Sequence, residues 1–380
     1  MKQPKLRFPE FTGDWKQHKF EDVVTIGSGK DYKHLESGNV PVYGTGGYML
    51  SVNQALSESE DAVGIGRKGT IDKPYILRAP FWTVDTLFYC IPNEGFDLTF
   101  TNCLFQNVDW KKKDESTGAP SLSKVIINNV KTYVPSLEEQ QKIAFLFTEL
   151  DSLIQSAEKE LEGYRELKQG MLQKMFPKTG EKVPEIRFPE FTGDWEQLKL
   201  SEVSDVRDGT HDSPSYQNEG HPFVTSKNVK DGYINYDDIQ YISDEDFNNI
   251  NKRSKVDIND ILMGMIGTIG NLALIRTEPD FAIKNVALIK DTKQISYLYL
   301  YYYLQSPSTE NQLLSGLDGG TQKFISLKKI RELNVSTPSE SEQLKIGEYF
   351  QNLDSLIASQ EQELDGYKEL KKGLLQQMFC

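Results

Sequence analysis

Several features that define large classes of proteins are scarce in this 380-residue sequence. Its three cysteines, Cys90, Cys103 and Cys380, show no C-x-x-C spacing, which argues against a zinc ribbon or a disulfide framework. The longest apolar run, Tyr297–Leu304, is far below the ~20 residues that cross a bilayer, and the first residues lack the apolar segment of a signal peptide. We therefore expect a cytoplasmic protein with no membrane contact.

Recognisable catalytic and metal-binding motifs are also missing from the sequence. Gly64–Gly69 matches G-x-G-x-x-G, but Pro74 follows too soon for a long helix whose N-terminus could face a pyrophosphate. The four histidines form no H-E-x-x-H motif, and none has metal-like spacing to a cysteine. We found no amino-methyltransferase signature and no nuclease cluster of carboxylates and lysine. The sequence therefore predicts a chain that is not an enzyme by itself and carries no metal site.

Positive charge is in short supply. The formal net charge is −13, with 16 basic and 16 acidic residues in 1–134 but 16 and 23 in 184–337. Because nonspecific affinity for DNA comes from lysine and arginine on phosphates, the chain alone is not expected to bind DNA strongly. A few side chains that read base edges remain compatible with this charge if partner subunits supply most of the positive field.

The sequence repeats itself at two offsets. RFPEFTGDW occurs at Arg7–Trp15 and again at Arg187–Trp195, while Pro135–Phe176 aligns without gaps on Pro338–Phe379 with 26 identities in 42 positions. We call residues 1–134 module one and residues 184–337 module two. The segment between the two repeats is 16–134 in module one and 196–337 in module two, where it is longer by 23 residues. Duplicated ends and diverged middles predict one shared role for the ends and two different roles for the middles.

The longer repeated segments are predicted to form coiled-coil helices. Ser136 three residues before Glu139, and Ser339 before Glu342, match a capped helix start. We call the stripe of apolar heptad positions on each helix its seam. Lys168 and Lys371 each occupy one seam position. In a parallel pair they would lie at the same level and repel each other, which favours an antiparallel pair. Amphipathic helices that each pack on their own module are the alternative. The apolar residues alternate at spacings of three and four, as in heptads: Ile143, Phe147, Leu150, Ile154, Ala157, Leu161, Tyr164, Met171 and Met175, with the same pattern in the copy.

The modules are predicted to be rich in β-strands. Gly66–Ile71 and Gly264–Ile269 are weakly similar, and each is followed by a strand-like run. We expect a single internal helix over 293–312. The strand-like runs bounded by turn residues are Val40–Tyr43, Ala62–Gly66, Leu87–Ile91, Phe223–Thr225, Ile261–Met265 and Ala287–Ile289.

The order of these elements resembles the specificity subunit of type I restriction-modification enzymes over essentially the whole chain. The resemblance rests on RFPEFTGDW opening each half, on P-x-x-x-E-Q-x-K-I opening each long helix, and on Asp208–His211, Phe223–Asn228 and Gly267–Gly270. It implies an α+β fold in which two β-rich target-recognition domains are separated by two long antiparallel coiled-coil helices, as a pseudo-two-fold internal repeat. The expected divisions are target-recognition domains at 1–134 and 184–337, with spacer helices at 135–183 and 338–380.

The resemblance also implies a function and a set of partners. The chain would be the DNA sequence-recognition subunit of a type I complex, each target-recognition domain reading one half of a bipartite asymmetric site in double-stranded DNA. The helices would set the spacer and dock two methyltransferase (modification) subunits, and restriction/translocase subunits would complete the complex. S-adenosylmethionine, ATP and Mg are expected on those partners, with no cofactor in this chain. The alternatives are a coiled-coil scaffold without sequence-specific DNA binding and a fused methyltransferase–specificity enzyme.

Candidate contact residues follow from their type and setting. Arg67 and Lys68 are the strongest DNA-binding candidates, because flanking glycines let a loop approach a base or phosphate closely. His211 also suits a turn, and for each candidate a solvated surface role is the alternative. The exact repetition of RFPEFTGDW suits a structural role at the helix junction rather than sequence reading, with Phe8, Phe11 and Trp15 as core anchors.

The full set of DNA-binding candidates is Lys30, Thr45, Tyr48, Arg67, Lys68, Lys111, Lys112 and Lys113 in module one, and Arg207, Thr210, His211, Ser226, Lys227, Asn228, Lys230, Lys252, Arg253 and Lys323 in module two. Apolar residues off the helix seam are candidates for binding the methyltransferase partners: Phe145, Leu146, Leu153, Leu167, Leu172, Tyr349, Leu356, Leu370 and Leu375.

Overall fold

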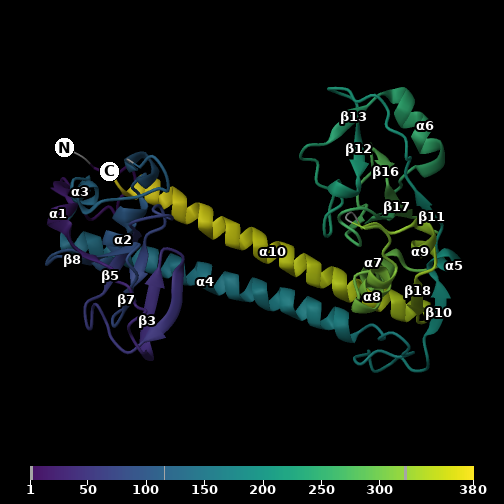
Figure 1. The fold of residues 1–380 in the computed structure, drawn as a ribbon, viewed down its shortest axis with the longest axis horizontal. Coiled ribbons are helices and arrows are strands. Elements are labelled where there is room, and N and C mark those ends of the chain that lie inside the picture. The colour runs from purple at the N-terminus through teal and green to yellow at the C-terminus, as the bar shows by residue number, and fades with distance from the viewer. Residues whose placement is uncertain (1–2, 115, 321–322) are drawn as a thin grey trace. The chain divides into compact units, whose positions relative to one another are not determined.

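A computed structural model describes residues 3–114, 116–320 and 323–380. The chain forms two compact units, Met1–Lys159 with Gln360–Cys380, and Glu160–Ser359. Each unit therefore joins one module to part of both long helices, α4 (Leu137–Lys174) and α10 (Glu340–Met378) (Figure 1). The two units are described separately below.

Unit 1 contains three sheets. A four-stranded antiparallel sheet has the order β2-β8-β5-β6, a three-stranded sheet has the order β4-β3-β7 with β3 and β7 parallel, and β1 pairs with β9. The strands are β1 (Lys16–Lys19), β2 (Val24–Ser28), β3 (Ser37–Gly44), β4 (Gly47–Val52), β5 (Ala62–Gly66), β6 (Tyr75–Leu77), β7 (Trp82–Thr83), β8 (Leu87–Pro92) and β9 (Lys131–Val134). The shorter helices are α1 (Phe20–Val23), α2 (Leu98–Gln106), the 3₁₀ turn η1 (Trp110–Lys113) and α3 (Lys124–Asn128).

Unit 2 repeats the same strand topology. Its sheets have the orders β11-β17-β14-β15, β13-β12-β16 with β12 and β16 parallel, and β10-β18. The strands are β10 (Glu196–Lys199), β11 (Val206–Asp208), β12 (His221–Thr225), β13 (Gln240–Ile242), β14 (Ile261–Gly264), β15 (Leu272–Leu274), β16 (Ala282–Lys284), β17 (Val286–Ile289) and β18 (Asn334–Thr337). The helices are α5 (Leu200–Val203), the 3₁₀ turn η2 (Ser226–Asn228), α6 (Asp244–Ser254), α7 (Tyr297–Tyr303), α8 (Pro307–Ser315) and α9 (Leu327–Arg331).

The fold class expected from the sequence is confirmed, including the duplicated β-rich modules and the predicted strands. The single helix expected over 293–312 is wrong, because the segment forms two helices, α7 and α8. Ser306 caps the second of these by accepting a hydrogen bond from the Thr309 amide, and Pro307 is its first residue. A proline has no amide hydrogen to continue the preceding helix and disfavours helical geometry in the residue before it, so the helix must break there.

The long helices pair in an antiparallel manner within each unit. In unit 1 the Lys371 ammonium contacts the Asp151 carboxylate at 2.5 Å, and in unit 2 Lys168 contacts Asp354 at 2.7 Å. These two ion pairs are related by the sequence repeat, and each joins a seam lysine of one helix to the opposite helix. The antiparallel pairing is as predicted, and each seam lysine in addition faces a carboxylate of the opposite helix, which the sequence analysis did not predict.

The last residues of each long helix fill a module core. Met175 and Phe176, which follow α4, are buried in unit 2, where the Phe176 ring stacks on Phe350 at 5.7 Å. Met378 and Phe379 take the equivalent place in unit 1, where Phe379 packs against Phe100 and Phe147. Each core therefore contains more than its own module and the start of the long helix that follows that module. Each core also needs the far end of the other helix.

The RFPEFTGDW repeats anchor the start of the long helices. In unit 1, Arg7 donates two hydrogen bonds to the buried Glu139 carboxylate at 2.7 and 2.8 Å, and Trp15 Nε1 donates a third at 3.2 Å. In unit 2, Arg187 binds the buried Glu342 in the same two-pronged geometry at 2.7 and 2.8 Å. Bidentate arginine–carboxylate pairs are strong and geometrically specific. The exact repetition of this motif thus has a structural cause.

Candidate nucleic-acid interface

In module one, the segment Thr83–Thr86 connects most of the predicted DNA-binding residues. Its carbonyl oxygens accept hydrogen bonds from the backbone of Lys30 at 2.9 Å, of Arg67 at 2.8 Å and of Lys68 at 3.3 Å. Val84 in the same segment donates to Tyr43 of β3 at 3.0 Å. The structure therefore brings the loop after β2, the β3–β4 hairpin and the loop after β5 to one edge of module one.

The β3–β4 hairpin projects an exposed tip beside this edge. Thr45 lies in the two-residue turn, and Gly47 after it has a φ of +105°, which only glycine adopts easily. Tyr48 and Met49 are large side chains exposed at the start of β4. The Tyr48 hydroxyl lies 3.2 Å from Ser51 Oγ, and the side chain as a whole remains exposed to solvent. A compact turn thus presents an aromatic ring to solvent.

Arg67 and Lys68 lie in a sharply folded loop after β5. A side chain at Gly66 would begin 2.0 Å from the Thr70 carbonyl oxygen, and Gly69 has a φ of +90°, so both glycines are needed for this conformation. The loop is held from the other side by the Leu122 amide, which donates to the Arg67 carbonyl at 2.9 Å. Both cationic side chains are exposed.

A cleft of about 670 Å³ opens beside this loop and contains a third cation that the sequence analysis missed. Lys124, the first residue of α3, donates to the Ile26 carbonyl at 2.7 Å, and its ammonium lies 6.0 Å from the centre of the Phe88 ring. The Arg67 guanidinium lies 5.9 Å from the centre of the same ring. No motif marks Lys124 in the sequence, because the two cations are 57 positions apart. The cleft is lined by Ser28, Arg67, Lys68, Asp85, Thr86, Phe88, Ser121, Leu122, Ser123 and Lys124.

The three lysines of η1 are exposed but differ in their ion pairing. Lys111 contacts Asp72 at 2.7 Å and Lys112 contacts Asp109 at 2.9 Å. The hydrogen bond to Asp72 raises the pKa of Lys111, and that to Asp109 raises the pKa of Lys112. Part of the charge expected from this basic run is therefore neutralised within the module.

In module two, Asn285 after β16 connects several predicted residues. The Thr210 carbonyl accepts from its amide at 3.3 Å, its side-chain oxygen lies 2.7 Å from the His211 ring, and its carbonyl accepts from Ser226 Oγ at 2.5 Å. His211 also lies 3.0 Å from Asp208, so its ring is held by two side chains although much of it is exposed. This arrangement supports the turn assignment for His211.

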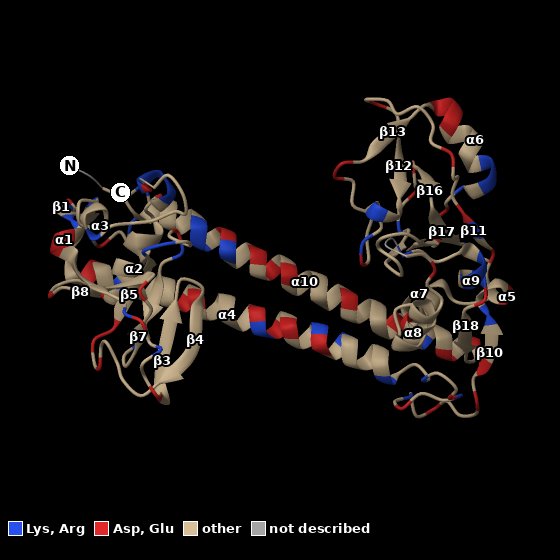
Figure 2. Ribbon diagram, viewed as in Figure 1, with Lys and Arg blue, Asp and Glu red and all other residues tan. Residues whose placement is uncertain are grey.

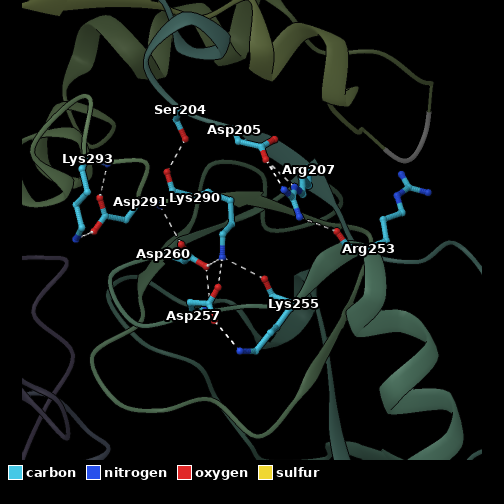
Figure 3. A network of polar contacts seen from close by, with 10 residues as sticks. All are labelled: Ser204, Asp205, Arg207, Arg253, Lys255, Asp257, Asp260, Lys290, Asp291 and Lys293. Carbon is cyan, nitrogen blue, oxygen red and sulfur yellow. Dashed lines mark hydrogen bonds and ion pairs between the residues drawn. The ribbon is translucent and has the colours of Figure 1, made fainter.

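Arg207 is bound to a neighbouring carboxylate and a carbonyl group (Figure 3), and Arg253 is bound to a buried carboxylate. Arg207 binds Asp205 at 2.6 and 2.8 Å and donates to the Arg253 carbonyl at 3.1 Å. The hydrogen bond to Asp205 raises the pKa of Arg207. Arg253 forms an ion pair with the buried Asp208. Neither arginine thus offers a free positive charge in this conformation.

Ser226 and Asn228 require a correction, because both lie in the interior. Ser226 Oγ donates to Asn285 and accepts from the Met265 amide at 3.0 Å, while Asn228 Oδ1 accepts from the amide and hydroxyl of Thr225 at 3.0 and 2.8 Å. The two residues are 5% and 2% exposed, and their side chains cannot reach a ligand without unfolding the turn. They support the loop that η2 begins.

That loop is the largest difference between the modules. Two residues join β3 to β4, whereas 226–239 join the equivalent strands β12 and β13. The longer connection exposes Tyr233 and Tyr236, which the sequence analysis missed, together with Lys227. Lys230, half-buried, donates its amide to the Tyr233 carbonyl at 2.9 Å. A surface with two exposed tyrosines and charged residues of both signs therefore occupies the place of the hairpin tip in module one.

The other two basic candidates of module two lie apart from Asn285 in the sequence. Lys252 is exposed in the last turn of α6, a helix with acidic residues at its start and basic residues at its end (Figure 2). This charge order complements the helix dipole and is sufficient to explain the residue. Lys323 is exposed and donates to the Gly319 carbonyl at 3.3 Å, next to Phe324.

The predicted partner-binding residues divide into two groups. Phe145, Leu153, Leu167, Leu356 and Leu370 are exposed on the long helices. The other four, Leu146, Leu172, Tyr349 and Leu375, are partly buried against the module cores. Only the first group offers a largely free apolar surface.

Two further features bear on the chemistry available. Among the described residues, no group of three or more histidine, cysteine, aspartate or glutamate side chains is arranged to hold a metal ion. Within the same ranges, no helix has both the length and the apolar character required to cross a bilayer.

The fold defines a class of protein in which two modules share one strand topology, differ in their exposed loops, and are each joined to a pair of repeated long helices. Residues 12–163 and 192–366 match the family model described as the type I restriction modification DNA specificity domain. The chain belongs to this family, and each half contains one copy of the domain.

Individual relatives agree with this assignment. The chain is 26% identical over 276 residues to the type I restriction enzyme MjaVIII specificity subunit of Methanocaldococcus jannaschii, a match that covers 70% of this chain and 65% of the relative. It is 27% identical over 164 residues to the EcoBI specificity subunit of Escherichia coli, covering 43% of this chain and 34% of the relative. The solved S subunit of a type I system from M. genitalium has the same fold, with a TM-score of 0.65 at 15% identity over 100% of this chain and 99% of that chain.

Proposed function

We propose that this chain is the DNA sequence-recognition subunit of a type I restriction-modification complex. Each module reads one half of a bipartite asymmetric site in double-stranded DNA. The observation that carries the proposal is the contrast between a repeated frame and diverged loops. The Arg7–Glu139 and Arg187–Glu342 anchors and the strand orders are alike, whereas the β3–β4 turn and the β12–β13 loop differ in length and side chains.

The exposed loops have the side chains that groove reading requires. In module one we assign groove reading to Thr45 and Tyr48, and contact with the DNA backbone to Arg67 and Lys68, at the edge organised by Thr83–Thr86. Hydroxyl groups can reach base edges, and arginine and lysine can bind phosphates. In module two we assign DNA contact to Thr210, Lys227 and Lys230, with Tyr233 and Tyr236 as additional contacts.

The long helices are proposed to connect recognition with catalysis on partner subunits. Leu153 and Leu370 belong to unit 1, and Leu167 and Leu356 to unit 2, all at positions that flank the seam. The repeat relates the two pairs, which suits the docking of two methyltransferase copies. S-adenosylmethionine, ATP and Mg are assigned to the partners, and this chain is assigned no catalysis of its own.

The test is to co-express the chain with its methyltransferase partner and map the methylated motif by methylome sequencing. A bipartite motif with an unspecified spacer supports the proposal. A gel shift with the purified complex should then retain a duplex that contains the motif, and a shuffled duplex should compete poorly. A labelled-methyl transfer assay on the isolated chain should give no signal. Absence of motif-specific methylation and of DNA retention would instead indicate a scaffold protein.

A further inference from the structure

The loop after β5 in module one and the loop after β14 in module two are built alike. A Cβ atom at Gly264 would lie 2.2 Å from the Thr268 carbonyl oxygen, as one at Gly66 would lie 2.0 Å from that of Thr70. Gly267 has a φ of +75°, as Gly69 has +90°. Each loop is also held by the same kind of backbone bond, since the Ile325 amide donates to the Met265 carbonyl at 3.0 Å in the manner of Leu122 and Arg67. The positions of the two loops can therefore be compared one by one.

At equivalent positions, module two has lost the cations of module one. Met265 stands at the place of Arg67, and Ile266 at the place of Lys68. The first residue of the following short helix is Lys124 in module one and Leu327 in module two. Met265 is buried, and Ile266 and Leu327 pack against the core of unit 2. A cationic cleft in one module thus corresponds to an apolar contact in the other.

The cations of the module-one cleft are not neutralised. Among the described residues, none forms an ion pair with Arg67, Lys68 or Lys124. Arg67 reaches only the Asp85 carbonyl at 3.4 Å, and Lys124 only that of Ile26. The hydroxyl groups of Ser28, Thr86, Ser121 and Ser123 line the same cleft. Asp85 also lines the cleft, so its residues carry a formal charge of three positive against one negative. In a chain with a net charge of −13, this excess of cations beside hydroxyl donors forms a site for an anion with several oxygens.

We propose that Arg67, Lys68 and Lys124 bind backbone phosphates of DNA at the first half-site, and that module two has no equivalent phosphate site. This inference rests on the proposed function, since the ligand is duplex DNA. Its consequence is an electrostatic imbalance between the half-sites. Each phosphate contact releases condensed counterions and so makes the affinity depend on salt. Most of the salt dependence should therefore come from contacts with the half-site that module one reads. Module two then depends more on direct contacts from its expanded loop.

The experiment compares two doubly substituted complexes of the full chain with its methyltransferase partner. Affinity for a duplex containing the methylated motif is measured by fluorescence anisotropy over a range of salt concentrations. Arg67→Gln with Lys124→Gln should reduce the slope of log affinity against log salt by about 2, since each phosphate contact contributes ~0.9. Lys227→Gln with Lys323→Gln, which removes the same charge from module two, should change the slope by less than half as much.

Additional variants separate phosphate binding from structural damage. Lys16→Gln removes an exposed lysine from β1 and should leave the slope unchanged. Lys124→Arg keeps the charge and should retain the wild-type slope, which a purely structural role for Lys124 does not predict. In phosphate-ethylation interference, the variant with both Arg67 and Lys124 replaced should become insensitive to ethylation at the first half-site alone.

The outcomes distinguish this inference from the proposed function. Motif-specific binding with equal slope changes in the two double variants would overturn the phosphate assignment but leave DNA recognition intact. An equal reduction of ethylation interference at the two half-sites would overturn it as well. No motif-specific binding by the wild-type complex would refute the proposed function, and the inference with it.

Discussion

Module one and module two have the same strand topology but different surface loops. The two modules therefore differ mainly in the side chains that they expose to solvent. The β2-β8-β5-β6 and β11-β17-β14-β15 sheets correspond strand for strand. By contrast, module two inserts α6, has α8 where module one has the short turn η1, and lengthens the β12–β13 connection. Core positions and strand pairs couple many residues at once, whereas a surface loop can change with little effect on its neighbours. Duplication has therefore preserved the frame and left the loops free to diverge.

The largest expected effect comes from lengthening the frame that the modules share. Inserting one heptad into both α4 and α10, at paired levels, keeps the apolar stripe in register because the seam repeats every seven residues. Seven residues add roughly 10 Å of helix, so the spacer of the methylated motif should lengthen by up to about 3 base pairs while both half-site sequences stay the same. Methylome sequencing measures both quantities.

A two-residue insertion is the matched control for the heptad. It rotates the apolar stripe out of the seam and should abolish methylation rather than reset the spacer. An intact, active heptad variant with an unchanged spacer would contradict the proposed role of the helices, and so would altered half-site bases.

The next largest effect concerns the buried arginine–glutamate anchors. Glu139→Ala and Glu342→Ala should each destabilise their unit by about 3–5 kcal/mol, because each leaves a largely buried arginine without its carboxylate. Glu139→Ala should cost about 1 kcal/mol more, since Glu139 also accepts from Trp15, whereas Trp195 Nε1 has no partner among the described residues. Urea unfolding gives the magnitudes, and hydrogen-exchange mass spectrometry localises them.

Glu138→Ala serves as the control for the anchors, because this neighbour of Glu139 is exposed and should change stability by no more than about 0.5 kcal/mol. Equal losses of protection in both units from Glu139→Ala alone would show that the units do not unfold separately.

A smaller effect is expected for partner binding. Leu153→Glu with Leu370→Glu should weaken one methyltransferase copy, and Leu167→Glu with Leu356→Glu the other, each by roughly 100-fold if both leucines are buried on docking. Native mass spectrometry should then show one partner copy per chain for each double variant, and two for wild type. Retention of two copies in both variants would place the docking surface elsewhere.

The smallest expected effect is a difference in acid sensitivity between the modules. In module two, Lys290 contacts Asp257 and Asp260 at 2.6 Å each (Figure 3), whereas the strand registers place the uncharged Ile91 of β8 at the equivalent position in module one. The hydrogen bond from Lys290 lowers the pKa of Asp257 below its usual 3.8. The stabilisation is therefore present above about pH 4 and is lost as the pH falls through the depressed folded-state pKa.

Hydrogen exchange between pH 3 and 6, corrected for intrinsic rates, should show β17 in unit 2 losing more protection at the acid end than the equivalent strand β8 in unit 1. Asp257→Asn should reduce that pH dependence, and Asp212→Asn, at an exposed position, should not. A pH dependence unchanged by Asp257→Asn would show that other groups control it.

Local patterns were enough to predict a large part of the architecture. The heptads, the two sequence repeats and the six strand-like runs all depend on neighbouring residues, and they were recognisable without tertiary structure. The seam lysines also predicted the antiparallel pairing, since like charges at one level repel. The Ser306-Pro307 pair also marks the break within 293–312 in the sequence itself, because proline lacks the amide hydrogen that would continue the preceding helix.

Contacts between distant residues were beyond local patterns. Nothing in the sequence places Lys124 beside Arg67, or shows that the Ser226 and Asn228 side chains turn inward to bind backbone groups. The parallel pairs β3–β7 and β12–β16 likewise join strands separated by about 40 to 60 positions. Residue type in the sequence identified candidates for DNA binding. Burial in the structure then separated the exposed candidates from those, such as Ser226 and Asn228, that hold a loop in place.

By itself, the sequence determined the duplicated plan of this protein, because repeats, heptads and capped helix starts are properties of short stretches of chain. Only the tertiary structure decided that the end of each long helix fills the core of the other module, and that three cations of module one share a cleft whose counterpart in module two is apolar. These features depend on which surfaces meet after folding. The free energy of such contacts comes from burial and charge pairing between residues far apart in the chain, which no local pattern records.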